Sequence, residues 1–241
     1  MMGNSCDEFA YVRENLARIE QDIQNACAAA GRRREEVTLM AVTKTVDAAR
    51  INTAIAAGVT HIGENRVQEF LEKQNELHLD GVQAHLIGHL QTNKVRRIVG
   101  QVDMIQSVDS ERLARAIATA AADTERGYTD VLVEVNIGNE ESKSGVPAEE
   151  LVPLLETIGQ FSGIRVRGLM AIPPILRTEA EKRAVFHQMY KLFIDIRGKN
   201  MDNITMEILS MGMSMDYVEA IREGSTMVRI GSAIFGERNY H

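Results

Sequence analysis

Three short polar segments of the 241-residue chain carry side chains that could bind or react with a small molecule. Lys44 follows a largely apolar run, and a lysine amine in a partly dry site can form a Schiff base with a carbonyl compound. Residues 210–214 and 231–232 are rich in serine and glycine, whose hydroxyls and unobstructed backbone N–H groups suit a phosphate. Arg229, just before the last segment, supplies a permanent cation. These residue types point to a phosphorylated carbonyl compound.

Each of these features also has a purely structural explanation. A lysine in the position of Lys44 can form an ion pair inside the fold, and a single glycine-serine loop is usually an ordinary tight turn. Two such loops after neighbouring strands are harder to explain as turns alone, because the last two loops of an α/β barrel commonly bind phosphate. The choice depends on which elements bring the segments together.

Eight short apolar runs alternate with helical patterns beyond residue 31. The expected strands cover residues 37–43, 60–63, 84–88, 104–108, 130–136, 166–171, 205–209 and 227–230. The expected helices between and after them cover residues 47–57, 67–76, 94–99, 110–124, 148–159, 179–199, 215–223 and 233–235. Strand then helix, repeated, requires parallel strands, and eight units are typical of a single (β/α)8 barrel of the TIM type. An open sheet of seven or eight strands is the alternative.

An amphipathic helix is expected before the first strand. Apolar side chains recur at steps of three and four residues over residues 9–23, which predicts a helix at about residues 6–30. Ser5 and Glu8 have the spacing of a capping box, and Gly31 is a typical stop. No interior stretch resembles a linker, so residues 1–241 are expected to form one domain.

Composition and charge exclude several other classes of protein. Lys and Arg number 27 against 34 Asp and Glu, and the resulting net charge of -7 disfavours nucleic-acid binding. Cys6 and Cys27 are too few for a disulfide framework or a structural zinc site, and His85 and His89 lack the glutamate of a zinc protease helix, so no metal is expected. With no long apolar run and no signal-like start, we expect a soluble, cytoplasmic protein that does not bind membranes.

Closing a barrel would place Arg229, on the last strand, opposite Lys44, on the first. Two unpaired cations would repel, so either carboxylates such as Glu64 and Glu134 neutralise them or an anionic ligand lies between them. Pyridoxal 5'-phosphate (PLP) would meet all of these groups, with its aldehyde at Lys44, its phosphate at the serine-glycine loops and its ring nitrogen towards Arg229. Because a guanidinium only donates, the ring would be a weak electron sink, which suits racemase-like chemistry or mere cofactor binding.

Six motifs resemble those of the pyridoxal phosphate homeostasis proteins, the YggS-like family, whose fold is similar to the barrel domain of bacterial alanine racemase. The motifs span nearly the whole chain and read AVTKT at 41–45, HIGEN at 61–65, HLIGHLQTNK at 85–94, GLM at 168–170, LSMGMSMD at 209–216 and GSTMVRIG at 224–231. Each alone is weak, but their order is specific. The family often has serine or valine in place of Thr43 and a tyrosine near Arg66, and neither departure removes a required group.

The resemblance implies a complete set of cofactor-binding residues. Lys44 would hold PLP as a Schiff base and Arg229 would meet the pyridine nitrogen. Ser210, Ser214, Gly231 and Ser232 would bind the phosphate, and the ring would lie against Asn65 and Met170. No residue is assigned a catalytic role.

The resemblance further implies a protein of intracellular PLP (vitamin B6) homeostasis, a monomer or weak dimer that handles PLP without known turnover and whose partners include PLP-dependent apo-enzymes. Alanine racemase needs a second base, a tyrosine from a C-terminal β-domain of the partner subunit. Few residues follow the last serine-glycine segment here, so we expect a carrier and not an enzyme. The alternatives are a PLP-dependent amino-acid racemase and another Schiff-base enzyme such as an aldolase.

Overall fold

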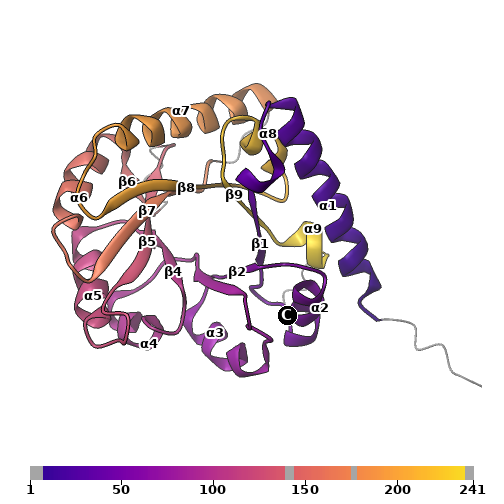
Figure 1. Ribbon diagram of the computed structural model, residues 1–241, viewed down its shortest axis with the longest axis horizontal. Coiled ribbons are helices and arrows are strands. Elements are labelled where there is room, and N and C mark those ends of the chain that lie inside the picture. The colour runs from indigo at the N-terminus through magenta and orange to yellow at the C-terminus, as the bar shows by residue number, and fades with distance from the viewer. Residues whose placement is uncertain (1–7, 139–143, 175–177, 237–241) are drawn as a thin grey trace, which may run out of the picture.

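The computed structural model describes residues 8–138, 144–174 and 178–236, and within them eight parallel strands close into a barrel (Figure 1). The barrel strands are β1 (Thr38–Val42), β2 (His61–Glu64), β3 (Gln83–Leu86), β4 (Met104–Val108), β5 (Thr129–Asn136), β7 (Ile164–Ala171), β8 (Ile204–Met213) and β9 (Met227–Ile230). Strand β1 pairs with both β2 and β9, and β4 pairs with β5, so the ring is closed. The expected barrel is confirmed, and the open sheet is excluded.

Helices surround the ring and follow the strands in order, as Figure 1 shows. They are α1 (Ala10–Ala29), α2 (Ala48–Ala56), α3 (Val67–Lys73), α4 (Val95–Ile98), α5 (Glu111–Ala121), α6 (Leu151–Ile158), α7 (Glu179–Arg197), α8 (Tyr217–Arg222) and α9 (Ser232–Phe235). Short 3-10 helices lie at Arg34–Glu36, Gln74–Glu76, Thr92–Lys94 and Ala148–Glu150. Among the described residues, none of these helices has the length and apolar character needed to span a bilayer.

Helix α1 starts later than the sequence predicts. It begins at Ala10, and the side chain of its N-cap residue, Phe9, makes no capping hydrogen bond. Ser5, of the expected capping box, lies outside the described residues. The predicted stop is confirmed, because Gly31 has a φ of +66° just beyond the helix end.

Two hydrogen bonds tie α1 to the last helices of the barrel. The Tyr217 hydroxyl of α8 donates to Asp22 Oδ2 at 2.8 Å, and the Asn15 amide donates to the carbonyl oxygen of Ile234 in α9 at 3.0 Å. Helix α1 therefore supports the turn that leads from β9 into α9.

Two strand features were not predicted. The two-residue strand β6 (Val146–Pro147) pairs with the end of β5. Strand β8 continues to Met213, beyond its predicted end at residue 209, because it pairs with β9 across an irregularity between Ser210 and Met213. Gly212 lies in that irregularity with a φ of +93°, and a Cβ atom there would approach the Ala220 Cβ to 2.6 Å. Only glycine fits this position without a shift of the backbone or of α8.

The barrel interior is unusual in being partly polar. A continuous apolar core lies between the strands and the helices, as in other α/β barrels. Inside the ring, by contrast, small apolar clusters around Met40 and Met104 alternate with fully buried polar groups such as His85, Gln106 and Ser210. These polar groups lie directly below the carboxyl end of the barrel, where the predicted site residues gather.

Candidate functional site

A cavity of about 280 Å³ opens at the carboxyl ends of the barrel strands. Its polar lining consists of Lys44, Asn65, Ser214, Arg229, Gly231 and Ser232. Its apolar lining consists of Val42, Ile87, Ile172, Met213 and Met215. A mainly apolar pocket with a few converging polar groups, close to roughly 300 Å³, is suited to a small ligand, and this end of the barrel carries the active site in enzymes of the fold.

Lys44 brings a free amine to this cavity. It lies two residues beyond the end of β1 and is half-buried. Within the part of the chain that the structure describes, its ammonium group makes no hydrogen bond and no ion pair. The ion pair that was the alternative explanation for this lysine is therefore not formed with any described residue.

Arg229 brings a buried cation to the same cavity. Its side chain is held by two neutral acceptors, because Nη1 donates to Ser210 Oγ at 2.7 Å and Nη2 donates to the Ala171 carbonyl oxygen at 2.9 Å. No carboxylate of the described residues pairs with it directly. Burial lowers the pKa of Arg229 to about 10, and the more distant charges of Glu134 and Asp216 oppose that effect. The guanidinium therefore stays charged at neutral pH and has N–H groups left for a ligand.

Of the two alternatives for the cations, neutralisation by carboxylates is not found among the described residues. Glu64 is 1% exposed and pairs with Lys73 of α3 at 2.5 Å, so this alternative is wrong for Glu64. Glu134 contacts neither cation through a hydrogen bond or ion pair within the described residues. Burial, followed by the charge of Asp109, raises the pKa of Glu134 to about 7, and Arg229 opposes this shift. Glu134 therefore carries only part of a negative charge at neutral pH.

A chain of hydrogen bonds runs down the barrel from Arg229. The Ser210 hydroxyl accepts from Arg229 and donates to Gln106 Oε1 at 2.7 Å. Gln106 Nε2 contacts His85 Nδ1 at 2.9 Å, and His85 Nε2 contacts Gln83 Oε1 at 3.3 Å. Burial lowers the pKa of His85 to about 3, so this imidazole is neutral, accepting at Nδ1 and donating at Nε2. Every member of the chain thus has a partner, and the chain fixes the orientation of Arg229.

Two backbone donors converge on one oxygen at the end of β9. The N–H groups of Gly231 and Ala233 donate to Ser214 Oγ at 3.2 and 3.3 Å. Asp216 Oδ1 accepts from the Met213 N–H at 2.6 Å and holds the preceding loop. Both N–H groups are engaged by this hydroxyl, so a phosphate at this turn would accept from the Ser214 hydroxyl itself or replace its oxygen as the acceptor.

Comparison with known proteins adds the family. The family profile described as alanine racemase, N-terminal domain, matches residues 15–239. The pyridoxal phosphate homeostasis protein of Aquifex aeolicus is 41% identical over 227 residues, which cover 94% of this chain and 98% of that protein. This chain belongs to the pyridoxal phosphate homeostasis protein family.

Solved structures agree with this assignment. PipY of Synechococcus elongatus, solved with PLP bound, has a TM-score of 0.80 and 35% identity, and the match covers 93% of this chain and all of PipY. Alanine racemase of Corynebacterium glutamicum has a TM-score of 0.69 at 16% identity, over 92% of this chain and 62% of the racemase. The second match shows a shared barrel fold.

In this member of the pyridoxal phosphate homeostasis family, the structure brings together six of the eight residues predicted for the site. Those six form the polar lining of the cavity described above. Ser210 and Met170 do not line it. Ser210 lies within β8, below Arg229, and its hydroxyl is engaged by Arg229 and Gln106. Met170 is fully buried and packs with Met104 and Leu132 inside the barrel.

Sequence reasoning missed the apolar half of the pocket and the groups that support the polar half. Ile172 follows directly after the end of β7, two residues beyond Met170, and a continued strand alternation could have indicated it. Gln106 lies two residues after Met104 on β4 and therefore shares its face, so strand alternation could have indicated that Gln106 points inward. Its hydrogen bond to Ser210 of a distant strand had no local signal.

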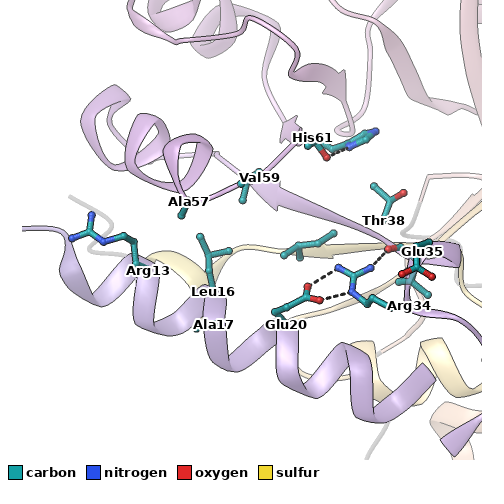
Figure 2. A pocket seen from close by; sticks show the side chains of 14 residues that line it. Arg13, Leu16, Ala17, Glu20, Arg34, Glu35, Thr38, Ala57, Val59 and His61 are labelled. Atoms are coloured by element: carbon teal, nitrogen blue, oxygen red, sulfur yellow. Dashed lines mark hydrogen bonds and ion pairs between the residues drawn. The ribbon is translucent and has the colours of Figure 1, made fainter. Parts of the chain in front are cut away.

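A second cavity, with a volume of about 680 Å³, lies between α1 and the amino ends of β1 and β2. Figure 2 shows the side chains that line it. Thr38 and His61, the first residues of those strands, lie on its wall. Arg34 donates to both carboxylate oxygens of Glu20 at 2.7 Å, so these two charges neutralise each other. No lysine belongs to its described lining, and in this fold the amino end of the barrel usually serves stability. The smaller cavity is therefore the candidate site.

Proposed function

We propose that this protein binds PLP at the carboxyl end of its barrel and acts in intracellular PLP homeostasis, with Lys44 as the covalent attachment point. The observation that carries the proposal is one cavity that contains, as far as the described residues show, an unpaired amine and a buried guanidinium without a carboxylate partner, beside a turn where two backbone N–H groups converge on the Ser214 hydroxyl. An anionic aldehyde complements all three features. The pyridoxal phosphate homeostasis proteins and the PLP-bound PipY structure support the same ligand.

Lys44 would form the carbon–nitrogen bond to the aldehyde, whose oxygen leaves as water. The Ser214 hydroxyl and the Gly231 and Ser232 backbone would receive the phosphate, and Asn65 would lie beside the ring. Ser210 and Met170 would act from below, Ser210 by holding Arg229 and Met170 by filling the barrel under the pocket. The apolar wall formed by residues such as Ile87 would exclude water from the amine.

Arg229 would donate a hydrogen bond to the ring nitrogen. A guanidinium cannot accept a proton from that nitrogen or give it one at neutral pH, so the nitrogen would stay unprotonated. PLP supplies an electron sink when bound, and this pairing weakens it. The arrangement favours holding the cofactor over reactions that build up negative charge on it.

The tyrosines support a carrier rather than a racemase. Among the described residues, no tyrosine lines the pocket, and Tyr217 donates its hydroxyl to Asp22 on the outer helix α1. A second proton-transferring tyrosine of the racemase kind is therefore not supplied by this part of the chain. We propose that PLP-dependent apo-enzymes are its partners, that it is a monomer or weak dimer, and that it works in the cytoplasm, where the buried free thiol of Cys27 stays reduced.

The visible spectrum tests the proposal directly. Protein purified with PLP should show an absorption band distinct from that of free PLP, and borohydride should fix the cofactor on Lys44, as read by peptide mass spectrometry. Lys44→Ala should lose both signals, whereas Lys191→Ala, at an exposed site on α7, should keep them. Attachment at another lysine, or no band at all, would overturn the proposal. Steady racemisation of an amino acid that depends on Lys44 would overturn the carrier role.

A further inference from the structure

Thr45, the residue after Lys44, has a strained backbone. Its φ of +60° lies in the left-handed region, which β-branched residues rarely adopt because Cβ crowds the backbone. The side chain is exposed, and its hydroxyl donates locally to the Lys44 carbonyl oxygen at 2.7 Å. Such a conformation persists only where surrounding groups hold it, and strained residues cluster at functional sites.

Two side chains of α3 hold the peptide groups on both sides of Lys44. Glu69 Oε1 accepts from the Thr45 N–H at 2.5 Å, and Lys73 Nζ donates to the Thr43 carbonyl oxygen at 2.8 Å. The Thr43 carbonyl belongs to the peptide before Lys44, and the Thr45 N–H belongs to the peptide after it. The two bonds therefore fix both backbone dihedrals of Lys44 and, with them, the direction of its Cα–Cβ bond.

Glu69 and Lys73 form one unit that is anchored in the barrel. They lie four residues apart on α3 and pair with each other at 3.0 Å. Lys73 also pairs with Glu64 of β2 at 2.5 Å. The Glu64 carboxylate accepts further bonds from the Thr43 hydroxyl at 3.1 Å and the Asn65 N–H at 2.7 Å, so this buried charge is well satisfied.

Glu64, Glu69 and Lys73 do not line the cavity. However, Glu69 and Lys73 are hydrogen-bonded to the two neighbours of Lys44, and Glu64 is hydrogen-bonded to Asn65. We propose that Glu69 and Lys73 are positioning residues, which hold the strained turn after β1 so that the Lys44 amine is aimed at the bound aldehyde. The inference rests on the proposed function. Without the Glu69 acceptor, the Thr45 backbone relaxes towards a negative φ and the peptide after Lys44 rotates. The Lys44 amine then no longer points at the aldehyde.

Glu69→Ala and Glu69→Gln together test the proposal. The alanine variant has no acceptor for the Thr45 N–H, and its PLP dissociation constant, measured from the Lys44-dependent absorption band, should rise roughly tenfold, as expected for one charged hydrogen bond. Glutamine keeps an oxygen acceptor but loses the ion pair with Lys73, so Glu69→Gln should bind PLP within about twofold of the wild type. Glu72→Ala is the matched control. Glu72 lies about one helical turn from Glu69, and among the described residues its side chain is hydrogen-bonded only to Gln68.

The outcomes separate this inference from the proposed function. Equal losses in Glu69→Ala and Glu69→Gln would assign the effect to the ion pair and overturn the positioning role, and so would wild-type affinity in both variants. If Glu69→Ala does not fold, Glu69→Asp, which keeps the charge but shortens the reach, should show the same loss, and wild-type affinity there would overturn the inference. A wild-type protein with no Lys44-dependent band would refute the proposed function itself.

Discussion

Replacing Glu134 by glutamine should stabilise the cofactor-free protein at alkaline pH far more than at acidic pH. Burial raises the pKa of this carboxyl from 4.5 to about 7, with a further contribution from Asp109 and opposition from Arg229. Between these pH values the folded protein keeps a proton that the unfolded chain has lost. The free energy of unfolding therefore falls, through this group, as the pH rises from about 4.5 to about 7, and the penalty is complete above pH 7.

The size of the effect follows from the two pKa values of Glu134. Their difference, about 2.5, corresponds to roughly 3 kcal/mol. Glutamine has nearly the same shape and no charge, so it avoids the penalty at every pH. The stability of Glu134→Gln relative to the wild type should therefore increase by about 2 to 3 kcal/mol between pH 5 and pH 8.

Urea denaturation at several pH values measures this difference, because titrating groups that do not interact with Glu134 contribute equally to both proteins. Glu156→Gln, at an exposed position on α6, is the control and should show no such trend. If the stability difference between Glu134→Gln and the wild type were the same at pH 5 and pH 8, the conclusion that burial raises the pKa of Glu134 would be refuted.

Three further substitutions test other parts of the site. Gln106→Leu removes the acceptor of the Ser210 hydroxyl proton and the donor to His85 Nδ1, so it should destabilise the protein by about 1–3 kcal/mol in urea denaturation. Ser214→Ala should weaken the binding of PLP but not of pyridoxal, which lacks the phosphate, and calorimetric titration of both ligands measures this; equal weakening would contradict the phosphate role. Gly212→Ala should lower the free energy of unfolding by about 1–3 kcal/mol, measured from the urea midpoint. The reason is that Gly212 has a φ of +93° and that a Cβ atom there would collide with Ala220 of α8.

The barrel was predictable because its pattern is repetitive. Each of the eight predicted strands overlaps one barrel strand, since runs that are apolar on both faces are typical of parallel strands between helices. Once the strands are placed, the fold itself brings their carboxyl ends together, which is why Lys44 and Arg229 share a cavity although 185 positions separate them in the sequence.

The depth of a residue in the barrel was harder to predict than its direction. Ser210 was expected in a loop, but β8 continues to Met213, so Ser210 lies below the pocket and Ser214 at its wall. Met170 shows the same error, because Ile172, two residues later and just past the end of β7, reaches the cavity. Alternation gives the face of a strand, whereas the height along the barrel axis depends on strand length and register.

Long-range polar contacts carried no signal that could be recognised in advance. Glu69 and Lys73 have the spacing of an ordinary ion pair on a helix, and nothing in that spacing indicates that both also bind the backbone beside Lys44. Likewise, the lysine that neutralises Glu64 comes from α3, whereas sequence reasoning considered only the groups at strand ends. Such contacts depend on how a helix packs on the barrel.

The direction of the interior hydrogen-bond chain follows from one residue at its top. Because Arg229 can only donate, Ser210 must accept from it and is free to donate to Gln106, whose amide then donates to the neutral His85. A protonated His85 would donate at both nitrogens and force the Gln106 amide to turn, so that Ser210 would accept from both sides and its own proton would lack an acceptor. The pKa of about 3 for His85 prevents this at neutral pH. Burial of an imidazole deep in the barrel thus keeps an acceptor for the Ser210 proton and a partner for every group of the hydrogen-bond chain.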